Sequence, residues 1–108
     1  MILLFLLQLK SHAAEVLGNL AKANVLALAN ALSETKVVQE LVAMLSPIDS
    51  NREDEIREAI FALRWLSSDH NMAQQIKAVQ GAELAIKEVA AGVNRAKMEA
   101  ETTLKQLE

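Results

Sequence analysis

The sequence predicts an all-α protein, and three observations support that fold class. Hydrophobic residues make up 52% of the 108 residues but aromatic residues only 3%, so the apolar content is mostly Ala, Leu, Val, Ile and Met. That composition favours helices over sheet. Three glycines and one proline leave few helix breakers. Apolar residues also recur at steps of three and four, and the length fits one domain, residues 1–108.

The first predicted element is a long helix over residues 2–23. Its first two turns are apolar nearly all round, so we expect them to pack against another helix or a second copy of the chain. The stripe continues through Ala13, Val16 and Leu20 in alternating steps of three and four. The residues that we expect to mediate self-association are Ile2, Leu3, Phe5, Leu6 and Leu9.

The next two helices are shorter. Asn24 is expected to open a helix that ends near residue 32, and Ser33 has the position of an N-cap for another that runs to residue 45. Pro47 ends that helix, because proline disfavours helical geometry in the residue before it and lacks a backbone N–H. Residues 47–51 are the clearest loop.

A fourth helix is predicted over residues 52–66. Ser50 and Glu53 have the spacing of a capping box, and acidic residues gather at the expected helix start. Arg57, Arg64 and the two aromatic residues are expected to lie beside the packing face. The predicted packing face consists of Ile56, Ala59, Ile60, Ala62 and Leu63.

Three further helices follow. Residues 67–70 break the pattern and supply caps for a short helix over 71–79, which ends at Gly81, a residue that tolerates left-handed geometry. A longer helix is marked by residues 84–89 and ends at Gly92. Asn94 is expected to cap a last helix from residue 95 onward. The inner residues expected of that helix are Met98, Thr103, Leu104 and Leu107.

One pattern of small residues and leucines recurs three times. The copies begin at residues 13, 59 and 100, so they start 46 and 41 residues apart. Such spacings are typical of helical repeats that stack into a solenoid. They divide the chain into a lone long helix over 1–23, a first repeat over 24–66 and a second repeat over 67–108.

Residues 55–107 resemble the armadillo repeat family. The resemblance rests on a third helix ending in Arg64-Trp65-Leu66, on the turn around Gly81, and on the helices before and after it. It implies a right-handed α-solenoid of about two repeats. A HEAT-like solenoid and a compact helical bundle are the alternatives.

The resemblance also implies where a partner would bind. In this family the third helices line a concave groove for an extended peptide, and two positions four residues apart point into it. Those pairs are Glu15 and Asn19, Phe61 and Trp65, and Thr102 and Gln106; Trp65 stands where the pattern has asparagine. Trp65 offers large apolar area and an N–H donor, and whether it lies in the groove or in the core is left open. The candidate partner-binding residues are Asn19, Arg57, Phe61, Arg64, Trp65 and Gln106.

Charge and cysteine content exclude several classes of partner. The net charge of −3 comes from 14 acidic and 11 basic residues, with no basic run that could follow a phosphate backbone, so no nucleic acid is expected. The chain has no cysteine, which excludes disulfides and thiolate zinc sites and favours a cytoplasmic or nuclear location. The apolar start is too short to span a bilayer, so no membrane partner is expected.

No residue pattern in the sequence indicates an enzyme. His12 and His70 are the only histidines, and neither has a second ligand at metal spacing, so no metal or other cofactor is expected. Residues 68–70 contain triad residue types, but consecutive positions cannot align them. The predicted function is therefore a non-enzymatic scaffold for a protein or peptide partner. The alternative is a structural or designed helical-repeat protein that assembles into a homo-oligomer through its N-terminal helix, with no separate ligand.

Overall fold

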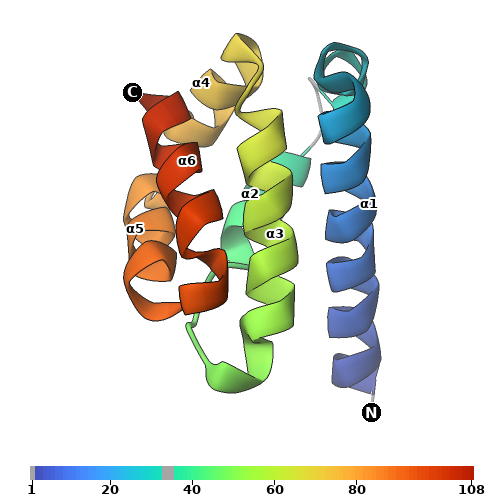
Figure 1. Ribbon diagram of the computed structural model, residues 1–108. Coiled ribbons are helices and arrows are strands. Elements are labelled where there is room, and N and C mark those ends of the chain that lie inside the picture. Colours follow the sequence, from blue (N-terminus) through green and yellow to red (C-terminus); the bar gives the residue numbers. More distant parts are fainter. Residues whose placement is uncertain (1, 33–35) are drawn as a thin grey trace.

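The computed structural model describes residues 2–32 and 36–108, and the side chains of residues 11–27 and 36–108. The described residues form six α-helices and two short 3₁₀ helices, which confirms the all-α prediction (Figure 1). In chain order these are α1 (Ile2–Leu32), α2 (Val37–Ala43), η1 (Ser50–Arg52), α3 (Glu53–Leu66), α4 (His70–Ala78), α5 (Ala82–Gly92), η2 (Asn94–Ala96) and α6 (Lys97–Leu107).

The helices lie in two groups. Helices α1, α3 and α6 lie side by side in that order, and the chain runs in the same direction along all three (Figure 1). Helices α2, α4 and α5 lie behind them and contact α3 and α6. The Cα radius of gyration is 12.6 Å, close to the ~13 Å expected for a compact domain of this length. The helices therefore form one compact globule.

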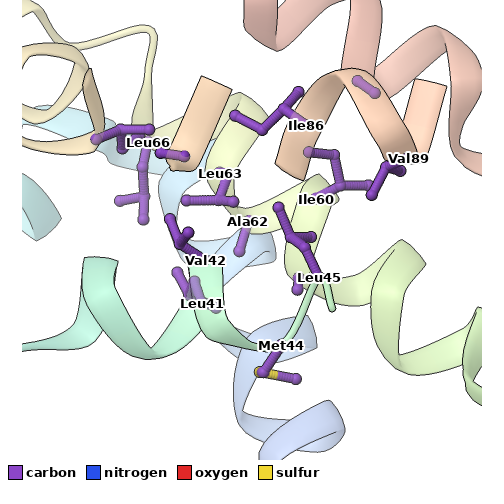
Figure 2. Packing of buried hydrophobic residues seen from close by; sticks show 14 of the residues in the cluster. Leu41, Val42, Met44, Leu45, Ile60, Ala62, Leu63, Leu66, Ile86 and Val89 are labelled. Atoms are coloured by element: carbon purple, nitrogen blue, oxygen red, sulfur yellow. The ribbon is translucent and has the colours of Figure 1, made fainter. Parts of the chain in front are cut away.

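Helix α3 lies at the centre of the core. Its predicted packing face is fully buried, and Leu66 extends it at the last turn. Leu41, Val42 and Leu45 approach this face from the α2 side and Ile86 and Val89 from α5 (Figure 2). Burial of each of these aliphatic side chains contributes about 1.5–3 kcal/mol. Helix α3 thus joins the two groups of helices.

Helix α1 packs on α3 through small residues. Ala14, Gly18 and Ala21 are the buried positions on this part of α1, and Leu17 is half-buried beside them. Gly18 faces the Phe61 ring so closely that an added Cβ would lie 2.4 Å from Cδ1 of Phe61. Only glycine permits this approach between the two helices.

The predicted apolar stripe of the first helix lies on the opposite side from α3. Val16 and Leu20 are 43% and 51% exposed, and Ala13 is exposed as well. The side chains of Ile2, Leu3, Phe5, Leu6 and Leu9 lie outside the described residues, as do Ser33 and Glu34.

Most predicted helix ends are close to the observed ones. Helix α1 continues past the predicted break at Asn24, but Asn24 has non-helical backbone angles. Its Oδ1 accepts a hydrogen bond from the Ala27 N–H at 3.2 Å. The predicted start of a new helix is therefore present as a kink within α1. The Asp69 carboxylate accepts from the Met72 N–H at 3.0 Å and caps α4. Gly81 has a φ of 79°, the left-handed geometry expected of it.

Two predicted caps are wrong. Asp49, not Ser50, supplies the side-chain oxygen before α3, because it accepts from the Asn51 N–H at 2.9 Å and starts η1. Asn94 caps nothing, because residues 94–96 form the 3₁₀ turn η2 and α6 begins only at Lys97.

The inner face of α6 differs from the predicted one at a single residue. Met98 was expected to be an inner residue, but it is 75% exposed. Thr103 and Leu107 are buried as predicted, and Leu104 is half-buried. Ala100 and Ala96 occupy the inner positions one and two turns before Thr103, at the spacing of a single helix face.

Candidate functional site

A surface hollow of about 290 Å³ lies across the row of parallel helices. Each helix of the row contributes to its walls, and η2 adds one residue at the start of α6. The lining residues are Glu15, Asn19, Arg57, Glu58, Phe61, Arg95 and Glu99.

Helical spacing brings these side chains to one side of the row. Asn19 follows Glu15 by four residues, and Phe61 follows Arg57 by the same step. Residues four apart lie above one another on a helix, so each helix presents a two-turn strip to the hollow. On α6 the strip comes from Glu99 and the preceding Arg95, not from the predicted pair Thr102 and Gln106.

Two aromatic rings form the wall next to the hollow. Phe61 and Trp65 meet edge to face, with ring centres 6.4 Å apart and planes at 71°. Cations lie over the Trp65 ring: Lys22 Nζ is 5.7 Å and Arg64 Cζ is 4.6 Å from its centre. The ring is half-buried against the core, and its Nε1–H is buried without a hydrogen-bond partner in the described part of the chain.

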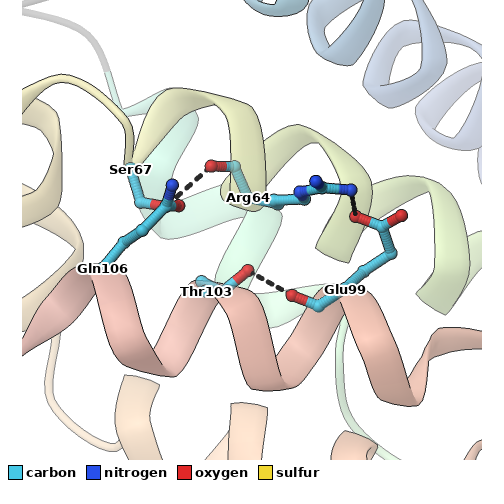
Figure 3. Close-up of polar contacts among 5 residues, drawn as sticks. All are labelled: Arg64, Ser67, Glu99, Thr103 and Gln106. Carbon is cyan, nitrogen blue, oxygen red and sulfur yellow. Dashed lines mark hydrogen bonds and ion pairs between the residues drawn. The ribbon is translucent and has the colours of Figure 1, made fainter.

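Arg64 connects α3 to α6. Its Nη1 donates to Glu99 Oε2 at 2.6 Å, a short charge-assisted hydrogen bond (Figure 3). The Thr103 hydroxyl donates to the Glu99 carbonyl at 2.7 Å, and the Ser67 hydroxyl donates to the Arg64 carbonyl at 2.7 Å. The Ser67 hydroxyl also contacts the side-chain amide of Gln106. Of these contacts, Arg64–Glu99 and Ser67–Gln106 connect the two helices, while the other two are local to one helix.

The other arginines at the hollow are paired as well. Arg57 lies 3.6 Å from the Asp54 carboxylate and 3.8 Å from that of Glu58, and Arg95 lies 3.4 Å from Asp54. Glu15 forms no ion pair with any residue whose side chain the structure describes. Among those residues, positive charge at this site is thus compensated within the chain, while the carboxylates are not fully matched.

The pKa of Glu58 reflects this excess of carboxylates. Its burial, first, and then the nearby Glu15 carboxylate raise the pKa of Glu58 above its usual value. Asp54 raises it further, and Arg57 opposes the change. A cation that entered the hollow would therefore meet two carboxylates that repel each other in its absence.

The structure brings some of the predicted binding residues together and separates others. Asn19, Arg57 and Phe61 line the hollow. Arg64 and Trp65 lie one turn further along α3, next to it. Gln106 is exposed at the other end of α6, against Ser67, and does not line the hollow.

The resemblance placed Glu15 at the groove, but the prediction missed Glu58, Glu99 and Arg95. Each of these residues lies three or four positions from another residue that lines the hollow, so the sequence shows which residues share a helix face. The sequence does not show that these faces meet in one hollow, because that depends on which helices pack side by side, and the three helices are far apart in the sequence.

Neither a candidate metal-binding cluster nor a candidate membrane span is found within residues 2–32 and 36–108. Within those ranges, no group of His, Cys, Asp and Glu side chains is placed to hold a metal ion. None of the helices that the structure describes combines the length and the apolar character needed to cross a membrane. Comparison with protein-family models, curated proteins and solved structures finds no match to this chain.

Proposed function

We propose that this chain is a non-enzymatic protein-interaction module, an armadillo-like right-handed solenoid segment of about two repeats that acts in the cytoplasm or nucleus. Its partner is an extended peptide or a helix bound along the face of α1, α3 and α6. One observation carries the proposal: three helices that run in the same direction present side chains to a single shared hollow. A strip of this kind, several helices wide, suits an elongated ligand.

The chemistry of the hollow favours a basic side chain in the partner. The arginines are already paired with carboxylates of the chain, so an acidic peptide would have to displace those contacts. Glu58 has Arg57 at 3.8 Å but is still raised in pKa by burial and by Glu15, so a lysine or arginine between Glu15 and Glu58 would relieve the repulsion of the two carboxylates. Phe61 provides apolar area for the stem of such a side chain, and the Asn19 amide can both donate to and accept from a peptide backbone.

Binding of labelled peptides, followed by fluorescence polarisation, tests the proposal. A panel of extended peptides that differ only in one central residue, lysine, glutamine or glutamate, would be titrated with the wild-type chain. We expect the lysine peptide to bind most tightly. Asn19→Ala and Phe61→Ala should each weaken it by about tenfold or more, the size of a typical anchor contact.

Asn71→Ala is the matched control, because Asn71 is an exposed asparagine on α4, in the other group of helices. It should leave binding unchanged. Equal affinity for all three peptides would refute the preference for a basic residue. Unchanged binding in both Asn19→Ala and Phe61→Ala, with helix content retained, would refute the site.

A further inference from the structure

Helix α1 is packed on one side only. Its described contacts are almost wholly with α3, through the small residues around Gly18. The opposite side exposes Ala13, Val16, Leu20 and Ala23, and none of these four residues is charged. We call these four residues the outer strip of α1.

An apolar hollow continues the outer strip toward α2. It has a volume of about 230 Å³ and opens between the two helices. Apart from Glu40, its lining is apolar, with Ala13 shared between hollow and strip. The other lining residues are Leu17, Val37, Leu41 and Met44. Strip and hollow together form one continuous apolar surface.

The spacing along the helix favours another helix as the occupant of this surface. In the sequence, Ile2, Leu6 and Leu9 precede Ala13, Val16 and Leu20 in strict alternation of four and three residues. A repeat of that period on one helix is the pattern of a coiled-coil seam, in which apolar side chains of two similar helices interlock.

Charge decides which helix can supply the partner surface. At the other end of the row, the exposed side of α6 carries Lys97, Glu101 and Lys105. That side does not match an uncharged strip, so a head-to-tail contact between copies is disfavoured. The same uncharged strip on a second copy matches it along its whole length, which gives a closed contact with two-fold symmetry.

The chain exposes more surface than a folded monomer of its mass usually does, which leaves area that a contact between copies can cover. The chain exposes 6559 Å² at a mass of 11.8 kDa. A folded monomer of that mass exposes about 5,900 Å², so roughly 600 Å² is in excess. A standard interface buries about 800 Å² on each partner. We propose that two copies of this chain form a homodimer through the outer strip of α1.

Light scattering coupled to gel filtration, at several protein concentrations, tests the proposal. We expect the wild-type chain to show twice the monomer mass at the higher concentrations. Val16→Glu combined with Leu20→Glu should give the monomer mass throughout, because the contact would then bury like charges. Leu84→Glu is the control: Leu84 is 63% exposed, on α5, and its substitution should leave the dimer intact.

Crosslinking gives a second measurement that does not depend on a disruptive variant. The chain contains no cysteine, so Val16→Cys introduces a unique thiol. Under mild oxidation it should crosslink to dimers, while Leu84→Cys should not. A monomeric wild type at all concentrations would overturn the proposal. So would a dimer that persists in the double glutamate variant, or masses that grow beyond the dimer, since these require a different surface or a head-to-tail partner.

Discussion

At the scale of single residues, Gly18 sets how closely α1 approaches α3. A methyl group at this position has no room, because the Phe61 ring already lies against the backbone. The small neighbours Ala14 and Ala21 keep the two helices close one turn on either side. The position of α1, and with it the place of Glu15 and Asn19 at the hollow, therefore depends on one hydrogen atom in the side chain of residue 18.

Gly18→Ala should lower the free energy of unfolding by about 1–3 kcal/mol, the usual cost of overpacking a close contact. Urea denaturation followed by circular dichroism measures it. Gly92→Ala is the control, since its added Cβ would lie 3.5 Å from Ile48, an ordinary distance, and its stability should stay equal or rise by up to about 1 kcal/mol.

Combining Gly18→Ala with Phe61→Leu should recover part of the loss, because the shorter side chain withdraws from the added methyl group. A double-mutant cycle measures that coupling. Additive effects of the two substitutions would show that Phe61 is not the group that excludes a Cβ at residue 18.

Glu58 gives the site a dependence on pH. Since burial and Glu15 raise the pKa of Glu58 in the folded state, the folded chain holds this proton more tightly than the unfolded chain does. Stability from this group is therefore full below the pKa of the unfolded chain and falls as pH rises through the pKa of the folded one. At neutral pH, the charged Glu58 is destabilising.

Glu58→Gln should accordingly show a small gain in the free energy of unfolding at pH 7, and that gain should shrink as the pH is lowered into the acidic range. Denaturation curves across that range measure the difference. Glu88→Gln, at an exposed position on α5, is the matched control for removal of one carboxylate. A gain that is constant with pH, or a loss at pH 7, would contradict the assignment.

At the scale of elements, the two groups of helices are held by different means. Helix α4 is short, nine residues, and begins at a side-chain cap from Asp69. Helix α6 begins without a side-chain cap and is instead tied to α3 by Arg64 and Glu99. Local hydrogen bonding thus defines α4, whereas tertiary contact positions α6.

Asp69→Ala should lower the free energy of unfolding by about 1 kcal/mol, because the first turn of α4 loses the acceptor for the Met72 N–H. Asp69→Asn should restore most of the loss, since asparagine caps equally well. Thermal melting of both variants and of Ser68→Ala, an exposed neighbour, measures the effect. Equal stability of Asp69→Ala and the wild type would rule out a capping role.

At the scale of the whole molecule, local signals in the sequence predicted the helices well and their surroundings less well. Asn24, Asp69 and Gly81 mark their helix ends because capping and left-handed geometry act within a few residues. The exposure of Met98 follows from ordinary helical spacing, since the buried residues Ala100, Thr103 and Leu107 define a face on which Met98 does not lie; the expectation for Met98 was therefore a wrong choice of face.

The orientation of α1 escaped prediction for a different reason. Its larger apolar residues, Val16 and Leu20, were expected to face the core. Helix α1 instead packs on α3 through its small residues, because the two helices lie very close together. The candidate site was predicted in part: Asn19, Arg57 and Phe61 meet at the hollow, and Gln106 does not. Side-chain periodicity predicts which residues share a face of one helix. Which faces of different helices meet depends on how the helices pack against one another.

In the row of α1, α3 and α6, α3 lies between the other two; α6 also packs against α5, whereas the described contacts of α1 are mainly with α3, so the α1 end of the row is the open one (Figure 1). A barrel or a closed bundle fixes its own circumference, but a row does not. If the chain is the solenoid segment proposed above, its length is a quantity that gene duplication or protein engineering can change one repeat at a time.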